Sequence, residues 1–205
     1  MTDPTPPDLV ALALALVAEH GWRRFSFAEL ARRAGTGLAG VYAELPDRPA
    51  ILRVLGRRLD AEMLAIDMAE LDGLSPRERL FELVMRRLDA MAPFKPGLRA
   101  IGREAPCNPG LLVAACCNVD RLGRRLVDAA GIAGDRLHEA IARRAIGVIY
   151  LRAFRVWLAD ETPDMARTLA ELDRRLQQAE TAARWAERLR PRSRPASPSD
   201  EAAPA

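Results

Sequence analysis

The chain has 205 residues, of which 49% are apolar and 29% charged, and this composition excludes a disordered polypeptide. The length suits one larger domain or two small domains that share a core. The formal net charge is +3, and nearly all positive charge is arginine because Lys95 is the only lysine, which weakly favours an anionic partner.

Residues 1–55 are predicted to form three helices. An apolar helix runs over 8–21, and its lack of a polar face places it between other helices. Ser26 and Glu29 have the spacing of a capping box and start a second helix. After a glycine break, a short third helix covers 38–45. A helix, a glycine turn and a second short helix are typical of a helix-turn-helix.

The rest of the chain is also predicted to be helical, with no strand pattern and no internal repeat. A long helix over 48–71 is capped by Asp47, and a capping box of Ser75 and Glu78 starts the next helix. The remaining predicted helices cover 98–104, 111–130, 135–160 and 162–189. The predicted fold class is therefore all-α, and residues 191–205 are predicted to be a disordered tail by composition.

Neither a catalytic site nor a metal site is predicted. The sequence has no phosphate-binding glycine loop, no GxSxG and no HExxH, so we expect no enzymatic activity. The cysteines Cys107, Cys116 and Cys117 lack metal or disulfide spacing, so no cofactor is predicted. Cys116 and Cys117 are expected to be inert core thiols in an apolar helix. Without a signal peptide or an apolar run long enough for a bilayer, we expect a cytoplasmic protein.

The segments LALVAEHGWRRFSFAELARRAG and VYAELPDRPAILRVL resemble the beginning of tetracycline-repressor (TetR) family regulators. The resemblance implies an N-terminal helix-turn-helix DNA-binding domain over 1–55. A long helix would join it to a helical ligand-binding and dimerisation domain over 56–190. It further implies a homodimer that binds a double-stranded DNA operator and responds to a small-molecule ligand, and we expect a repressor.

The recognition helix of this motif, TGLAGVYAEL, departs from the family pattern. Leu38 and Gly40 stand where the family usually has lysine and threonine, although Tyr42 falls on its phosphate-contacting tyrosine. Base readout needs side chains that reach base edges, and the segment offers almost none. The predicted DNA contacts are Thr36 and Tyr42, with Arg24, Arg32, Arg33 and Arg48 on the flanks as phosphate ligands. A solvated arginine surface is the open alternative.

Tyr150, Phe154 and Trp157 give one C-terminal helix a large apolar surface, which we predict lines the site of an apolar ligand. Core packing or a dimer interface is the alternative. The segments LDAMAPFKPGLRAI and VIYLRAFRVWLADETPDMARTLAELDRRLQ also resemble ubiquinone-biosynthesis accessory proteins, which share the TetR-like fold and bind lipids. That resemblance implies an alternative function, binding of a lipid or isoprenoid with a helix-turn-helix that does not bind DNA. Only this alternative includes contact with a membrane.

Overall fold

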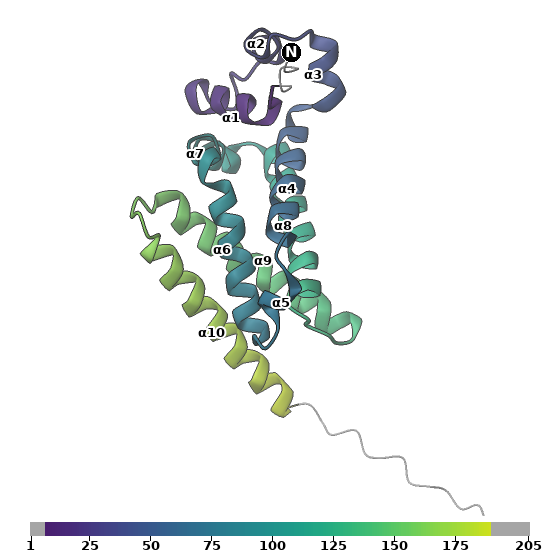
Figure 1. Ribbon diagram of the computed structural model, residues 1–205, viewed down its shortest axis with the longest axis vertical. Coiled ribbons are helices and arrows are strands. Elements are labelled where there is room, and N and C mark those ends of the chain that lie inside the picture. The colour runs from purple at the N-terminus through teal and green to yellow at the C-terminus, as the bar shows by residue number, and fades with distance from the viewer. Residues whose placement is uncertain (1–6, 190–205) are drawn as a thin grey trace, which may run out of the picture.

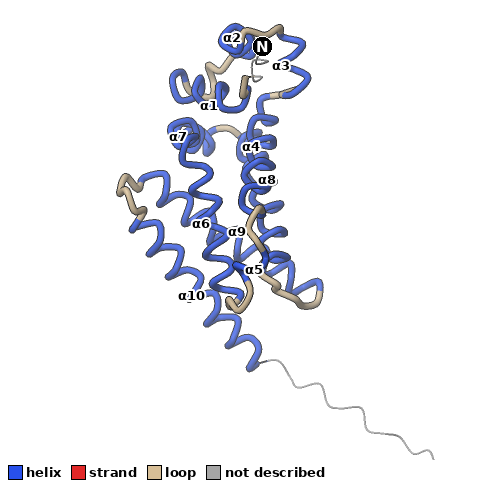
Figure 2. Tube along the Cα trace, viewed as in Figure 1, coloured by secondary structure: helices blue, strands red, loops and turns tan. Residues whose placement is uncertain are grey.

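A computed structural model describes residues 7–189; the predicted tail over 191–205 lies outside the described residues. Within 7–189 every regular element is a helix (Figure 2), which confirms the all-α prediction. The elements are α1 (Leu9–His20), α2 (Phe27–Ala34), α3 (Leu38–Glu44), α4 (Arg48–Leu64), α5 (Met68–Leu71), α6 (Pro76–Met91), α7 (Lys95–Glu104), α8 (Pro109–Ala129), α9 (Arg136–Ala159) and α10 (Ala166–Leu189), with short 3-10 turns at Ala92–Phe94 and Ala105–Cys107.

Side chains placed just before the helices set most of the helix starts. Asp8 accepts backbone hydrogen bonds in the first turn of α1, and Asp47 accepts one from the amide of Ala50 at 2.7 Å. Ser75 and Glu78 form the predicted capping box, because each side chain binds the other's backbone amide. These bonds satisfy amides that have no partner inside the helix.

One predicted capping box is not formed, and one predicted helix start differs from the structure. Ser26 precedes α2 as predicted, but its side chain makes no cap hydrogen bond, and Glu29 forms an ion pair with Arg32 at 2.7 Å. The last helix begins at Ala166 rather than near 162, since Met165 has a left-handed backbone conformation (φ 50°) that interrupts the helix.

The helix predicted over 48–71 is divided in the structure into α4 and α5. Asp67 starts α5 by accepting a backbone hydrogen bond at 3.0 Å. Arg86 in α6 donates to the carbonyl oxygens of Glu62 and Ala65, at 3.1 and 3.2 Å, where α4 ends. A tertiary contact from another helix therefore satisfies the carbonyl groups that a continuing helix would have used.

The helices α1–α3 form one end of an elongated molecule, and α4 leads from this end into the bundle of α6, α8, α9 and α10 (Figure 1). The α7 helix packs on α1 and makes a second connection to that end. A Cβ atom on Gly97 would lie 2.5 Å from the carbonyl oxygen of Leu14, so glycine permits this close approach. Glu104 accepts from the amides of Trp22 and Arg23 at 2.8 and 3.2 Å.

The outer face of α8 and α9 exposes apolar side chains, namely Leu112, Val113, Leu137, Ile141, Val148 and Leu151. Cys116 and Cys117 are also exposed in α8, so the expectation that they are core thiols is wrong. Sequence suggested burial because the segment is apolar, but α8 presents only part of its apolar surface to the bundle. Across 7–189, no helix is both long and apolar enough to cross a membrane.

Candidate nucleic-acid interface

The short helices at the end of the molecule rest on a fully buried apolar base. Leu30 of α2, Val41 of α3 and Leu45 at the end of α3 have no exposed surface. The ring of Phe27 lies 5.2 Å from that of Phe25, and burial of these groups anchors α2 and α3 on α1. Apolar packing therefore helps to set the positions of α2 and α3.

The opposite face of α3 is open to solvent. Tyr42 is 48% exposed, and its ring packs at 5.0 Å on that of Phe27, which holds the phenol in place. Thr36 is exposed just before α3, and Leu38 is exposed in its first turn. A Cβ atom at Gly40 would lie 2.9 Å from the Thr36 hydroxyl oxygen, so the missing side chain leaves room for Thr36 to lie over the helix.

Arg33 is held by an ion pair inside this end of the molecule. Its guanidinium donates to both carboxylate oxygens of Glu19 in α1, at 2.6 and 2.9 Å. The Arg33 guanidinium holds the pKa of Glu19 below its usual range, and Glu19 raises the pKa of Arg33. Water screens this exposed ion pair, so it contributes little to stability.

Arg48 is engaged with the backbone of the loop between α1 and α2. Its guanidinium donates to the carbonyl oxygen of Phe25 at 2.7 Å and, more weakly, to those of Trp22 and Arg23 at 3.5 and 3.4 Å. It also lies 6.0 Å from the centre of the Phe25 ring. These contacts give Arg48 a role in shaping the loop, in addition to any contact with phosphate.

Arg24 and Arg32 are the two predicted phosphate ligands whose guanidinium groups remain most accessible. Arg24 is exposed and uses one donor, Nε, on the carbonyl oxygen of His20 at 3.0 Å. The side chain of Arg32 is 74% exposed beside Glu29. The structure thus places Thr36, Tyr42 and Arg32 at one end of the molecule, on α2, α3 and their connection. Arg33 and Arg48 are also exposed there, but their guanidinium groups are engaged by Glu19 and by the α1–α2 loop.

The predicted ligand-binding aromatics stack along one side of α9. Ring centres lie 6.0 Å apart for Tyr150 and Phe154, and 5.7 Å apart for Phe154 and Trp157. Tyr150 and Trp157 are buried, while Phe154 is half-buried. Two surface grooves of about 400 and 690 Å³ lie at the α9–α10 corner and beside the end of α1, and neither is lined by these rings.

The residues that carry the second resemblance meet at one corner of the bundle. Lys95 lies 4.8 Å from the Trp157 ring centre and donates to the carbonyl oxygen of Asp160 at 2.5 Å. The Asp160 carboxylate accepts from the hydroxyl groups of Thr162 and Thr168 at 2.6 and 2.7 Å. These bonds, led by the one from Thr162, hold the pKa of Asp160 below its usual range. Each of these residues has a structural role in joining α7, α9 and α10.

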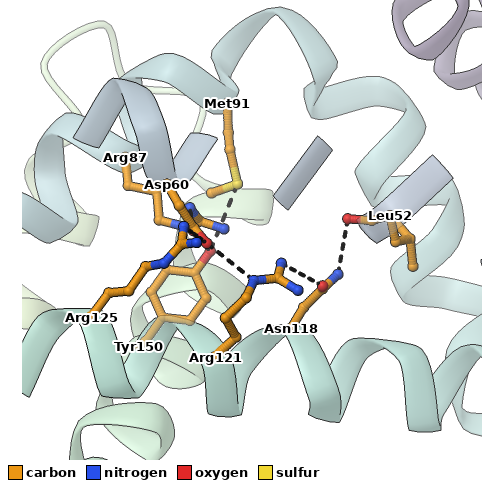
Figure 3. Close-up of polar contacts among 8 residues, drawn as sticks. All are labelled: Leu52, Asp60, Arg87, Met91, Asn118, Arg121, Arg125 and Tyr150. Atoms are coloured by element: carbon orange, nitrogen blue, oxygen red, sulfur yellow. Dashed lines mark hydrogen bonds and ion pairs between the residues drawn. The ribbon is translucent and has the colours of Figure 1, made fainter. Parts of the chain in front are cut away.

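Sequence reasoning missed the buried aspartate of α4. Asp60 is fully buried and lies between arginines of α6 and α8 (Figure 3). The available signal was its spacing, because Gly56, Asp60 and Met63 recur every three or four residues on the buried face of α4. A charged residue on an apolar stripe is a sign of burial with partners.

Solved structures with the same fold are TetR transcriptional regulators. A regulator from Nitrosomonas europaea matches with a TM-score of 0.71 at 24% identity, over 87% of this chain and 99% of the other. A regulator from Rhodococcus sp. RHA1 matches with a TM-score of 0.59 at 20% identity, over 85% of this chain and 94% of the other. A regulator from Streptomyces coelicolor matches with a TM-score of 0.62 at 17% identity, over 88% of this chain and 82% of the other. No family model matches the chain, and no curated protein matches it. The chain therefore has the fold of TetR transcriptional regulators.

Proposed function

We propose that this protein is a ligand-responsive, DNA-binding transcriptional regulator that acts as a repressor. The observation that carries the proposal is the exposed face of α3, with Tyr42 held by Phe27 above a buried base. A helix presented in this way at the end of the molecule suits the major groove of DNA. Residues 1–55 form the DNA-binding part, called the reader below, and residues 56–190 form the ligand-binding and dimerisation part. The protein acts by binding, in the cytoplasm, where its DNA target lies.

Affinity in this proposal comes from the DNA backbone more than from base edges. Tyr42 and Arg32 contact phosphates, and Arg24 does so from the neighbouring loop. Arg33 joins them by exchanging Glu19 for a phosphate. Base readout falls to Thr36 and to apolar contacts of Leu38, because α3 has no Arg, Lys, Asn or Gln, and its Glu44 is paired with Arg58.

The exposed apolar face of α8 and α9, defined above, supports a homodimer in which two copies bury this face against each other. Two readers must then lie about 34–36 Å apart to enter successive major grooves on one side of DNA. A ligand bound among the C-terminal helices, near Phe154, would move α4 and change that distance. When the two DNA-binding parts of the dimer are no longer about 34–36 Å apart, they cannot both enter the major groove, and the protein dissociates from the DNA.

The test begins with selection of DNA fragments from the source genome by the purified protein, followed by fluorescence anisotropy on an enriched fragment. Tyr42→Ala should weaken binding by roughly 10-fold or more, since it removes a positioned phosphate contact. Arg32→Gln should weaken binding on all sequences and reduce the slope of log K against log salt by about 0.9.

Arg184→Gln is the matched control, because Arg184 is exposed on α10 and pairs with Glu180 much as Arg32 pairs with Glu29. It changes the net charge equally but lies at the other end of the molecule, so the salt slope should stay unchanged. If no fragment is enriched, or if Arg32→Gln and Arg184→Gln have the same effect, the proposed reader is refuted.

A further inference from the structure

One buried carboxylate in the bundle is surrounded by three arginines. Arg87 of α6 pairs with Asp60 on one carboxylate oxygen. Arg121 and Arg125 of α8 donate to the other oxygen at 3.2 and 2.5 Å. Figure 3 shows these side chains converging from α6 and α8 on the α4 helix. The four residues are called the arginine cluster below.

The arginine cluster holds more positive than negative charge. Three guanidinium groups face one carboxylate, which leaves two positive charges in excess, and no other carboxylate of residues 7–189 forms an ion pair with them. Charge withdrawn from water is costly unless it is paired. The exposed side-chain fraction rises from 5% at Arg87 to 24% at Arg121 and 34% at Arg125, so the excess charge can be reached from solvent along α8.

Several donors of the cluster are also unused. Arg121 binds Asp60 through Nε and Asn118 through Nη2 at 2.8 Å, whereas its Nη1 has no partner within 7–189. Arg125 binds Asp60 through Nη1 only, and its Nε and Nη2 make no hydrogen bond to any residue of 7–189. Arg121 and Arg125 lie one helical turn apart, and their free donors suit the two oxygens of a planar carboxylate.

The α4 backbone leaves space for this arrangement. A Cβ atom on Gly56 would lie 2.5 Å from Arg121 Nη2 and 3.2 Å from Asn118 Oδ1, so glycine lets the guanidinium lie directly on the helix. Asn118 in turn donates to the carbonyl oxygen of Leu52 at 3.0 Å. The polar contacts of α8 with α4 thus run from Leu52 to Asp60.

We propose that Arg121 and Arg125 bind the carboxylate of a small-molecule effector, which competes with Asp60 for their guanidinium groups. Asp60 itself indicates the chemistry, because it is the carboxylate that the cluster already holds. The proposal rests on the proposed function for its consequence: Asp60 lies on α4, so its release frees the helix that leads to the reader. The effector is thereby an organic acid, more specific than the apolar ligand expected from sequence.

The experiment measures binding without DNA. Thermal unfolding of the full chain is followed with acetate, benzoate or octanoate, with octanamide as a neutral isostere of octanoate and inorganic phosphate as a second anion. At about ten times its Kd, a bound carboxylate should raise Tm by about 3–6 °C. Octanamide and phosphate should cause no shift beyond that of sodium chloride at equal ionic strength.

Arg125→Gln should abolish the carboxylate-dependent shift, whereas Arg124→Gln should keep it. Arg124 is the matched control, because it neighbours Arg125 on α8 but is 57% exposed and pairs with Asp120. Should Arg125→Gln fail to fold, Arg121→Gln provides a second reading: Arg121 is 24% exposed, and removal of its guanidinium should also abolish the carboxylate-dependent shift.

The inference is overturned if none of the three carboxylates shifts Tm, if octanamide or phosphate shifts it equally, or if Arg125→Gln retains the shift. Its failure is separable from that of the proposed function. DNA binding without a carboxylate shift would leave the regulator standing and remove this site. A carboxylate shift without DNA binding would retain the site and remove the reader.

Discussion

Replacement of Gly97 by alanine tests whether the contact of α7 with α1 is as close as the structure indicates. The added methyl group would lie 2.5 Å from the Leu14 carbonyl oxygen and 3.0 Å from the Leu14 Cβ atom. Ordinary Cβ contacts begin near 3.4 Å, so α1 and α7 must separate by roughly the difference. The obstacle is backbone, which cannot rotate away as a side chain can.

The magnitude follows from two opposing effects. Forced overpacking of a close helix contact costs typically about 1–3 kcal/mol, and a backbone clash belongs at the upper end of that range. Alanine is better than glycine inside a helix by about 1 kcal/mol. The expected net loss is about 1–2 kcal/mol in the free energy of unfolding, or about 2–8 °C in Tm for a chain of this size.

Gly102 gives a matched control in the same helix. It is exposed, and a Cβ atom there would meet only Leu158 Cδ1, at 3.4 Å. Gly102→Ala should therefore stabilise the protein by about 0.5–1 kcal/mol through helix propensity alone. Urea denaturation followed by far-UV circular dichroism, at one fixed protein concentration, measures both variants against the parent chain.

Opposite signs for the two substitutions are the expected result. If Gly97→Ala is as stable as the parent or more stable, then α1 and α7 are not in backbone contact and the reasoning fails. The substitution should also affect the proposed reader, because Glu104 of α7 binds the loop after α1. Gly97→Ala should weaken the packing of the proposed reader against α7.

Two further predictions concern the C-terminal helices. Asp160 has a lowered pKa, so its contribution to stability is present above about pH 4, the value for an unfolded aspartate, and is lost as pH falls further toward the folded pKa. Asp160→Asn should therefore have a lower free energy of unfolding than the parent at pH 7, and this difference should shrink below pH 4. Urea titrations at several pH values measure it, and a difference that does not change with pH would contradict the prediction. Val148→Glu on α9 should yield a helical monomer in analytical ultracentrifugation, because it places a charge on the exposed apolar face, whereas Trp185→Glu on α10 should leave the oligomeric state unchanged.

Local sequence signals predicted the elements well where their physical cause was local. Asp47 and the pair Ser75–Glu78 cap helices at the predicted positions, since a cap depends on residues within one turn. The last helix is also present, with Leu172 and Leu176 buried against the bundle. The aromatic rings of α9 were singled out by their residue type on one predicted helix.

The errors arose where a distant residue decides the outcome. Arg86 ends α4 from another helix, and no pattern within 48–71 contains that information. Cys116 and Cys117 lie on an apolar segment that the bundle covers only in part. The contacts of Arg33 with Glu19 and of Arg48 with the α1–α2 loop likewise depend on how the helices meet.

The sequence by itself determined an all-helical chain, the two short helices around a glycine turn near its beginning and the shortage of polar side chains on α3, because these depend on periodicity, capping and residue type. Only the tertiary structure placed Asp60 among three arginines from α6 and α8, and Gly97 against the backbone of α1. Asp60 and Arg125 are far apart in the chain, and their charges meet only when three helices pack together. Pairing of buried charge is a property of the assembled core, which no single segment contains.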